Sequence, residues 1–160
     1  MKIGDQLPWL RDGTDDDGRP LNWRDMRRNR VVFFTHPDRC AACTCYAHAL
    51  VERGDRLTTW DTDLWLVGAT ASDVVPDGAG VLRVTGDADQ RLRQRCGLRP
   101  DDARLVVADR WGQIWQTAAA DDDHMLVDPG DVLETTTWIA TQCPECETLD
   151  QPTGDWSSVR

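Results

Sequence analysis

Two cysteines, three positions apart, stand where an apolar run gives way to a helix-compatible segment. Residues 31–34 read Val-Val-Phe-Phe, which is typical of a buried strand, and Cys40 and Cys43 follow after a short polar turn. The amino end of a helix favours a thiolate over a thiol, and the thiolate is the reactive form of cysteine. This segment is therefore the first candidate for chemistry.

The spacing suits a pair of thiols that exchange disulfides. Over three residues a helix turns by about 300°, so the sulfurs of Cys40 and Cys43 lie on nearly the same side. Cys40 is expected at the exposed end. Cys43 shares a stripe with Tyr46 and Leu50, so it is expected to face the core. Disulfide exchange requires an exposed attacking thiol and a nearby resolving thiol. The alternative is that both cysteines are small core residues.

Two neighbouring side chains are candidates for tuning the thiolate. Arg39 adjoins Cys40 and favours its charged form, whereas Asp38 opposes it. Thr35, at the end of the expected strand, is the second candidate. Arg39 and Thr35 are therefore assigned to the candidate site.

Four of the six cysteines form two Cys-x-x-Cys pairs. In a reducing compartment such pairs are more often redox or metal sites than structural bridges. The second pair, Cys143 and Cys146, occurs as Cys-Pro-Glu-Cys, a common half of a zinc site, and tetrahedral zinc takes four such thiolates. The interpretations left open are a zinc site made of Cys40, Cys43, Cys143 and Cys146, a zinc shared between two copies, a relay in which the second dithiol resolves or reduces the first, and thiols without a chemical role.

Length and charge narrow the class of protein. A chain of 160 residues with 40% hydrophobic residues suits one folded domain. The formal net charge is −10, and an acidic surface repels phosphate backbones, so nucleic acid is not an expected partner. No apolar run approaches the length of a membrane span, and the first residues lack the order of a secretory signal. We therefore expect an acidic, cytoplasmic protein without a membrane partner.

The elements that must position the cysteines alternate between strand and helix. The expected order is a strand at 31–35, a helix at 40–61 with a bend at Gly54, a strand at 64–70, a short strand at 81–84, a helix at 87–96 that ends at Gly97, a hairpin of strands at 104–108 and 113–117, and a helix at 129–142 capped by Asp128. This order predicts an α/β domain with a mixed sheet over residues 1–142, followed by a polar tail at 143–160 that contains the second cysteine pair.

Three segments carry a family resemblance. They are the apolar strand at 31–34, the Cys40-Ala41-Ala42-Cys43 motif, and residues 105–114, which read as a strand, an Asp-x-x-Gly turn and the start of a hairpin. In these segments the chain resembles the thioredoxin-like superfamily, specifically its redoxin and peroxiredoxin-like branch of the alkyl hydroperoxide reductase/thiol-specific antioxidant type. The resemblance implies a thioredoxin-like fold, with a central mixed sheet flanked by helices.

The resemblance also implies a redox activity, with Cys40 as the attacking thiol and Cys43 as its resolver. The substrate would be a protein disulfide, a small-molecule disulfide or a peroxide, and an external thiol would restore the reduced state. No organic cofactor is then required, zinc stays open as a cofactor, and the family allows an oligomer.

The chain departs from the family pattern around the dithiol. Arg39 stands where thioredoxins carry tryptophan, and Ala41-Ala42 replaces Gly-Pro between the cysteines. The place of the usual cis-proline falls near Ala103, whereas the nearest proline is Pro100.

The peroxiredoxin pattern Pro-x-x-x-Thr-x-x-Cys is not kept, because Pro37 lies too close to Cys43. Arg104 lies near the place of the peroxiredoxin arginine, one residue out of register. The leading prediction is thus a thiol–disulfide oxidoreductase. The alternatives are a thiol peroxidase, or a non-catalytic redoxin-like module in which the two pairs hold zinc or support a partner interface.

Overall fold

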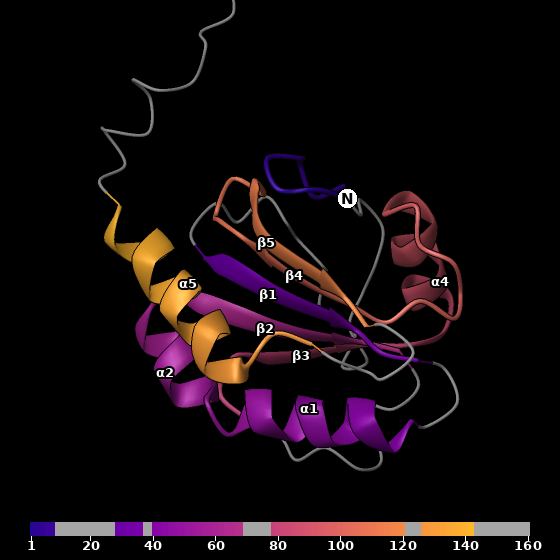
Figure 1. Ribbon diagram of the computed structural model, residues 1–160, viewed down its shortest axis with the longest axis horizontal. Coiled ribbons are helices and arrows are strands. Elements are labelled where there is room, and N and C mark those ends of the chain that lie inside the picture. The colour runs from indigo at the N-terminus through magenta and orange to yellow at the C-terminus, as the bar shows by residue number, and fades with distance from the viewer. Residues whose placement is uncertain (9–27, 37–39, 69–77, 121–125, 143–160) are drawn as a thin grey trace, which may run out of the picture.

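The computed structural model describes residues 1–8, 28–36, 40–68, 78–120 and 126–142. Within these ranges a five-stranded sheet forms the centre, and helices cover both of its faces (Figure 1). The expected mixed α/β architecture is therefore confirmed. The expected tail at 143–160 lies outside the described residues, so its separation from the domain stays a prediction.

Nine elements follow one another along the described chain. They are β1 (Asn29–Phe34), α1 (Ala41–Val51), α2 (Gly54–Thr59), β2 (Thr62–Val67), β3 (Val81–Val84), α4 (Gly86–Arg95), β4 (Arg104–Ala108), β5 (Ile114–Ala119) and α5 (Pro129–Thr141).

The sheet has the strand order β3-β2-β1-β4-β5. Strands β1, β2 and β3 are parallel, whereas β4 runs antiparallel to both β1 and β5. The parallel strands therefore end at one edge of the sheet. Backbone N–H groups extend the pairing just beyond them, with Thr35 donating to the Val67 carbonyl at 2.9 Å and Gly68 donating to that of Val84 at 2.9 Å. In open α/β sheets such an edge is where ligands bind.

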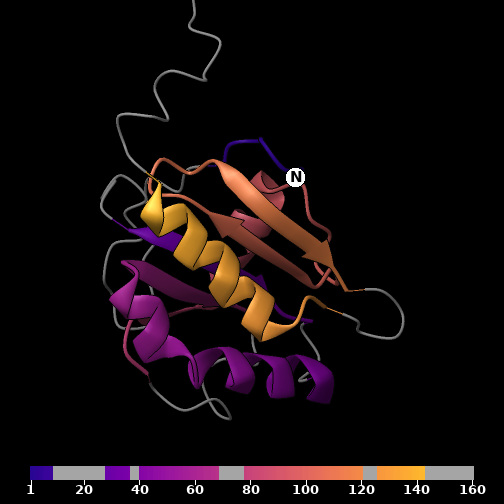
Figure 2. The ribbon, with the colours of Figure 1, turned by 60° about the vertical axis from the view of Figure 1, so that its left-hand side comes forward.

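Each face of the sheet has its own core, because successive side chains of a strand point to opposite faces. On β1, Val31 and Phe33 pack with residues of α1, α2 and α5, and Val32 and Phe34 pack with residues of α4. Figure 2 shows α5 lying across the first of these faces, with α1 and α2 on the same side. The four consecutive apolar residues of β1 are thus explained, because both faces of this strand are buried.

The helix expected at 40–61 is divided into two helices, so the interruption lies at Gly54 as predicted but is a break and not a bend. Helix α1 ends at Val51 and α2 begins at Gly54. At Gly54 a side-chain Cβ would lie only 3.1 Å from the Ala79 carbonyl oxygen, so the glycine allows the segment before β3 to pack against the junction. Asp61, at a φ of 48°, then turns the chain into β2.

Other boundaries differ by a few residues. Strand β2 starts two residues earlier than expected and ends at Val67, because Gly68 adopts a φ of 130°, which is not extended backbone. Strand β5 reaches Ala119. The expected cap of α5 is confirmed, because the Asp128 carboxylate accepts a hydrogen bond from the Gly130 N–H at 2.6 Å.

No helix in the described ranges is long and apolar enough to cross a membrane.

Candidate functional site

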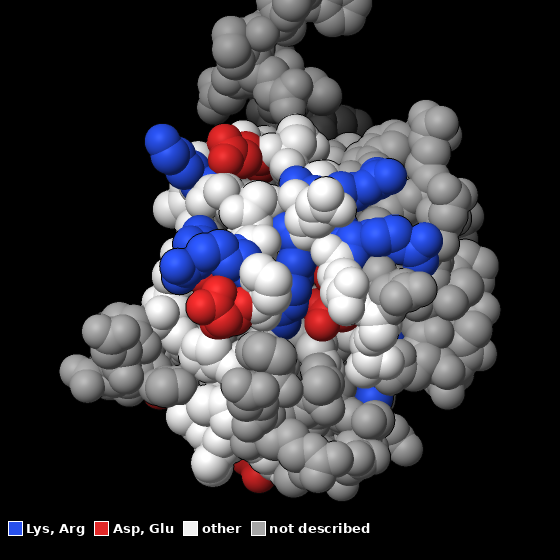
Figure 3. Space-filling view, turned by 90° about the vertical axis from the view of Figure 1, so that its right-hand side faces the viewer, with Lys and Arg blue, Asp and Glu red and all other residues white. Residues whose placement is uncertain are grey.

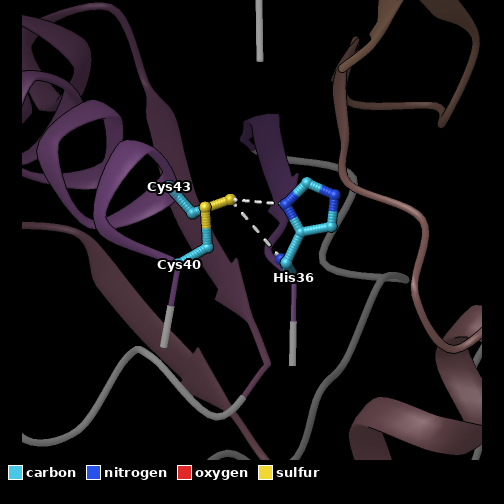
Figure 4. Close-up of side chains that lie close together, drawn as sticks. All are labelled: His36, Cys40 and Cys43. Atoms are coloured by element: carbon cyan, nitrogen blue, oxygen red, sulfur yellow. Dashed lines mark hydrogen bonds between the residues drawn. The ribbon is translucent and has the colours of Figure 1, made fainter. Parts of the chain in front are cut away.

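The candidate site lies where β1 ends and α1 begins. Thr35 and His36 continue from β1, Cys40 is the N-cap residue of α1, and Cys43 lies in its first turn. The Cys40 side chain makes no capping hydrogen bond, so its sulfur is not engaged by the helix backbone. Figure 4 shows the side chains of His36, Cys40 and Cys43 converging on one point. One ring nitrogen and two sulfurs lie within 4.8 Å of one another.

The two cysteines differ in exposure as their spacing predicts. Cys40 is half-buried, whereas Cys43 is 2% exposed and packs in the core beneath α1. Both are free thiols. A more accessible first sulfur and a shielded second sulfur within reach are the arrangement that disulfide exchange uses.

His36 is a site residue that the sequence reasoning missed. Its Nδ1 lies 3.2 Å from the Cys43 sulfur, and its backbone N–H approaches the same sulfur at 3.5 Å. Seven positions separate the two residues, but His36 follows β1 and Cys43 lies in the first turn of α1, so no single helix or strand period relates them. The available clue was its position, because a residue that follows a parallel strand lies at the binding edge of the sheet.

The environment of Cys43 favours the thiol over the thiolate. Burial, helped by the nearby Cys40 sulfur, raises the pKa of Cys43 to about 11. The His36 backbone N–H and the Arg93 guanidinium act in the opposite direction. At neutral pH Cys43 therefore holds its proton, and any reaction in which it attacks must first remove that proton.

Arg93, on α4, is a second residue that the sequence did not indicate. Its side chain is almost fully buried, with 4% exposure, and makes an ion pair with Asp89 at 2.6 Å. The rest of the guanidinium donates to three backbone carbonyl oxygens, of Thr35 at 2.5 Å, Val67 at 3.2 Å and Asp102 at 2.7 Å. Arg93 thereby ties the ends of β1 and β2 together at Thr35, one residue before His36.

Arg104, which the sequence placed near the position of the peroxiredoxin arginine, does not face the dithiol. Residues 104, 106 and 108 lie on the same face of β4, because side chains two positions apart on a strand point the same way. Val106 and Ala108 pack in the core on the α4 side of the sheet. Its guanidinium donates to the Met1 carbonyl at 3.3 Å. Cys43 belongs to the core on the other face. The alternation of the strand thus directs Arg104 away from the dithiol.

The face over α4 is rich in positive charge despite the acidic composition of the chain. Figure 3 shows Lys and Arg side chains gathered there, with a few acidic side chains among them. Arg91 and Arg95 are exposed on α4 and stand one helical turn apart. The net charge of −10 is therefore not spread evenly over the described surface.

The remaining candidate residues fall into two groups. Thr35 is buried, and its hydroxyl donates to the Val67 carbonyl at 3.4 Å, so its role in tuning the thiolate stays a prediction. Ala103 packs in the same core as Cys43, and the described residues contain no cis peptide bond. Three of the predicted site residues lie outside the described residues: Arg39, Cys143 and Cys146.

Comparison with known proteins identifies the fold. No family model matches the chain, and no curated protein matches its sequence. Among solved structures, Mycobacterium bovis AhpC aligns with a TM-score of 0.62 and 18% identity, covering 90% of this chain and 96% of that one. Xanthomonas campestris peroxiredoxin Q aligns with a TM-score of 0.63 and 14% identity, covering 85% of this chain and 99% of that one.

A third structure comes from a protein of another description. The thioredoxin domain of a thiol-disulfide oxidoreductase from Bacteroides vulgatus aligns with a TM-score of 0.62 and 14% identity, covering 87% of this chain and 99% of that one. These alignments span nearly the whole of each solved structure. The sequence identities are low, so the alignments show a shared fold. The chain has a thioredoxin-like fold, as its sequence resemblance implied.

Proposed function

We propose that this chain is a thiol–disulfide oxidoreductase that works through Cys40 and Cys43. The observation that carries the proposal is the pairing of a half-buried sulfur at the start of α1 with a buried sulfur less than 4.8 Å away, at the edge where the parallel strands end. The substrate would be a protein or small-molecule disulfide, and the partner an external thiol reductant. Because such a cycle needs a reduced resting state, it fits the cytoplasm.

The first step is attack by the Cys40 thiolate on one sulfur of the substrate disulfide. A bond forms between Cys40 and that sulfur, the substrate S–S bond breaks, and the other substrate half leaves as a thiolate. Cys40 suits this step because it is the more accessible of the two thiols and stands at a helix amino end.

The second step is resolution by Cys43. His36 Nδ1, at 3.2 Å, is placed to accept the Cys43 proton when its lone pair faces the sulfur. The thiolate then attacks the Cys40 sulfur, the mixed disulfide breaks, and the second substrate half leaves. Two electrons have passed from the dithiol to the substrate, and an external thiol reverses the change. The high pKa of Cys43 makes its thiolate a strong nucleophile and makes a nearby base useful.

Serine substitutions separate these roles. Cys40→Ser should abolish reduction of a small aromatic disulfide, because no attacking thiol remains. Cys43→Ser should stop after one turnover and accumulate a mixed disulfide on Cys40, visible as added mass in the intact protein. Cys45→Ser is the matched control, since Cys45 is exposed on the same helix, and it should leave the rate unchanged. Undiminished exchange in Cys40→Ser would reject the mechanism.

A thiol peroxidase is the second candidate. It is favoured by the structural likeness to proteins described as AhpC and peroxiredoxin Q. The thiolate would attack one peroxide oxygen, so that the O–O bond breaks, a sulfenic acid forms and an alcohol or water leaves. The second thiol would then attack the sulfenic sulfur, releasing water and forming the disulfide. Hydrogen peroxide consumption that exceeds disulfide reduction, and that is lost in Cys40→Ser, would favour this candidate.

A further inference from the structure

The donors gathered at the site are those that zinc prefers. Thiolate sulfur and imidazole nitrogen are the usual ligands of Zn²⁺ in proteins. Three such atoms converge here from two segments of the chain: Nδ1 of His36, after β1, and the sulfurs of Cys40 and Cys43, at the start of α1 (Figure 4). We propose that His36, Cys40 and Cys43 together bind one Zn²⁺ ion when the dithiol is reduced, with the fourth position left to an exogenous ligand.

The geometry is close to that of a zinc site. With Zn–S bonds of about 2.3 Å and Zn–N bonds of about 2.0 Å, tetrahedral ligands stand about 3.5 Å apart for nitrogen and sulfur and about 3.8 Å for two sulfurs. Nδ1 of His36 lies 3.2 Å from the Cys43 sulfur, and all three donor atoms lie within 4.8 Å of one another. Side-chain adjustments of a few tenths of an ångström at the closest pair bring the donors to coordination distance.

The charge also fits a divalent ion. Two thiolates and a neutral imidazole balance the charge of Zn²⁺, so the complex is neutral at a place where Cys43 is nearly inaccessible to solvent. Three protein ligands with one open position are the pattern of zinc sites that exchange their fourth ligand. The site differs from the four-thiolate site that the sequence suggested, because His36 supplies the third donor within the described residues.

Metal binding and disulfide formation exclude each other, a consequence that rests on the proposed function. When a disulfide substrate accepts two electrons from the dithiol, the sulfurs of Cys40 and Cys43 join in an S–S bond. They no longer offer two thiolates, and the ion is released. Bound zinc would therefore prevent the two thiols from reacting until the ion dissociates.

The test is a metal titration of the full, reduced chain under anaerobic conditions. Co²⁺ serves as the spectroscopic probe, because thiolate ligation gives it charge-transfer absorption, and Zn²⁺ affinity is read by competition with a chromophoric chelator. One ion per chain is expected, and none in the protein oxidised at Cys40 and Cys43. Failure of the reduced chain to bind either ion would overturn the proposal.

Substitutions identify the ligands. His36→Ala should weaken zinc binding by about 100-fold or more, since loss of even an outer-shell partner commonly costs 10- to 100-fold. The matched controls are His48→Ala and Cys45→Ser on α1, which should bind as the natural chain does. Circular dichroism and thermal melting check that His36→Ala folds. Zinc binding that survives His36→Ala but is lost in Cys143→Ser would overturn the proposal and favour the four-thiolate site.

The two proposals fail separately. If zinc binds with His36 as a ligand but Cys40→Ser still exchanges disulfides, the proposed function fails and the metal site stands. If disulfide exchange depends on Cys40 but no zinc binds, the metal site fails and the function stands.

Discussion

Replacing Arg93 with methionine tests how the site is held together. The buried guanidinium donates to the carbonyl oxygens of Thr35, Val67 and Asp102 and pairs with Asp89. Methionine fills a similar volume but donates nothing, so three carbonyls lose a charged donor and Asp89 loses its partner.

The size of the effect follows from burial. The Arg93 side chain is 4% exposed and that of Asp89 17%, so solvent screens the pair only weakly. Removing one member of a buried ion pair commonly costs about 3–5 kcal/mol. We expect Arg93→Met to lower the free energy of unfolding by an amount in that range, which corresponds to a fall in melting temperature of about 10 °C for a chain of this size. Arg93→Lys keeps the charge and some of the donors, and should lose about half as much.

The assay is urea unfolding of the reduced protein, followed by tryptophan fluorescence. Arg91→Met is the matched control, because Arg91 is exposed two positions earlier on α4, and it should change the free energy by no more than about 0.5 kcal/mol. A second readout reports on the site itself. Without the Arg93 cation the pKa of Cys43 should rise, and alkylation of Cys43 at a fixed pH should slow. If Arg93→Met unfolds within about 1 kcal/mol of the natural chain, the guanidinium does not organise this edge of the sheet.

Three further outcomes test other parts of the fold and site. Gly68→Ala should lose about 2–3 kcal/mol of stability, because the φ of Gly68 is 130° and a Cβ there would overlap a threonine hydroxyl. Gly86→Ala should lose less, because Gly86 has a φ of 60° and a Cβ there would meet no atom within 4 Å. Equal losses in urea unfolding would refute the steric argument. Asp109→Asn should cost about 2 kcal/mol, because this buried carboxylate accepts from two backbone N–H groups and an indole N–H, and an unchanged melting temperature would count against that role. In the native reduced protein at pH 8, iodoacetamide should label exposed Cys45 well before Cys43. Because burial raises the pKa of Cys43 to about 11, its thiolate fraction and its alkylation rate should increase about tenfold with each unit of increasing pH, up to that value. A rate of Cys43 alkylation that levels off near pH 8 would contradict the shift.

Much of the scaffold could be predicted because its signals are local. The four apolar residues at 31–34 predicted a buried strand, and every one of them has no exposed surface. Asp128 and Pro129 predicted the start of α5, since a capping carboxylate and a proline act within one turn of the helix. The burial of Cys43 followed from the helical stripe that it shares with Leu50.

The errors occurred where distant segments meet. The expected helix at 40–61 divides at Gly54. The glycine predicted a bend there, but the full break into two helices accompanies the packing of the Ala79 backbone against Gly54, which no local pattern indicates. Arg104 was considered for the dithiol because of its place in the chain, yet the alternation of β4 turns it to the other face of the sheet.

The sequence by itself determined the fold class, the placement of Cys40 and Cys43 at a strand-to-helix junction, and which of the two is the more buried. These follow from helix and strand periods, through contacts a few residues apart. Only the tertiary structure decided which groups surround the sulfurs. His36 comes within 3.2 Å of Cys43 across seven positions, and Arg93 reaches the same edge from α4, fifty positions later. Such pairs depend on the order in which strands pair and on how the helices pack against the sheet, and no helix or strand period encodes either.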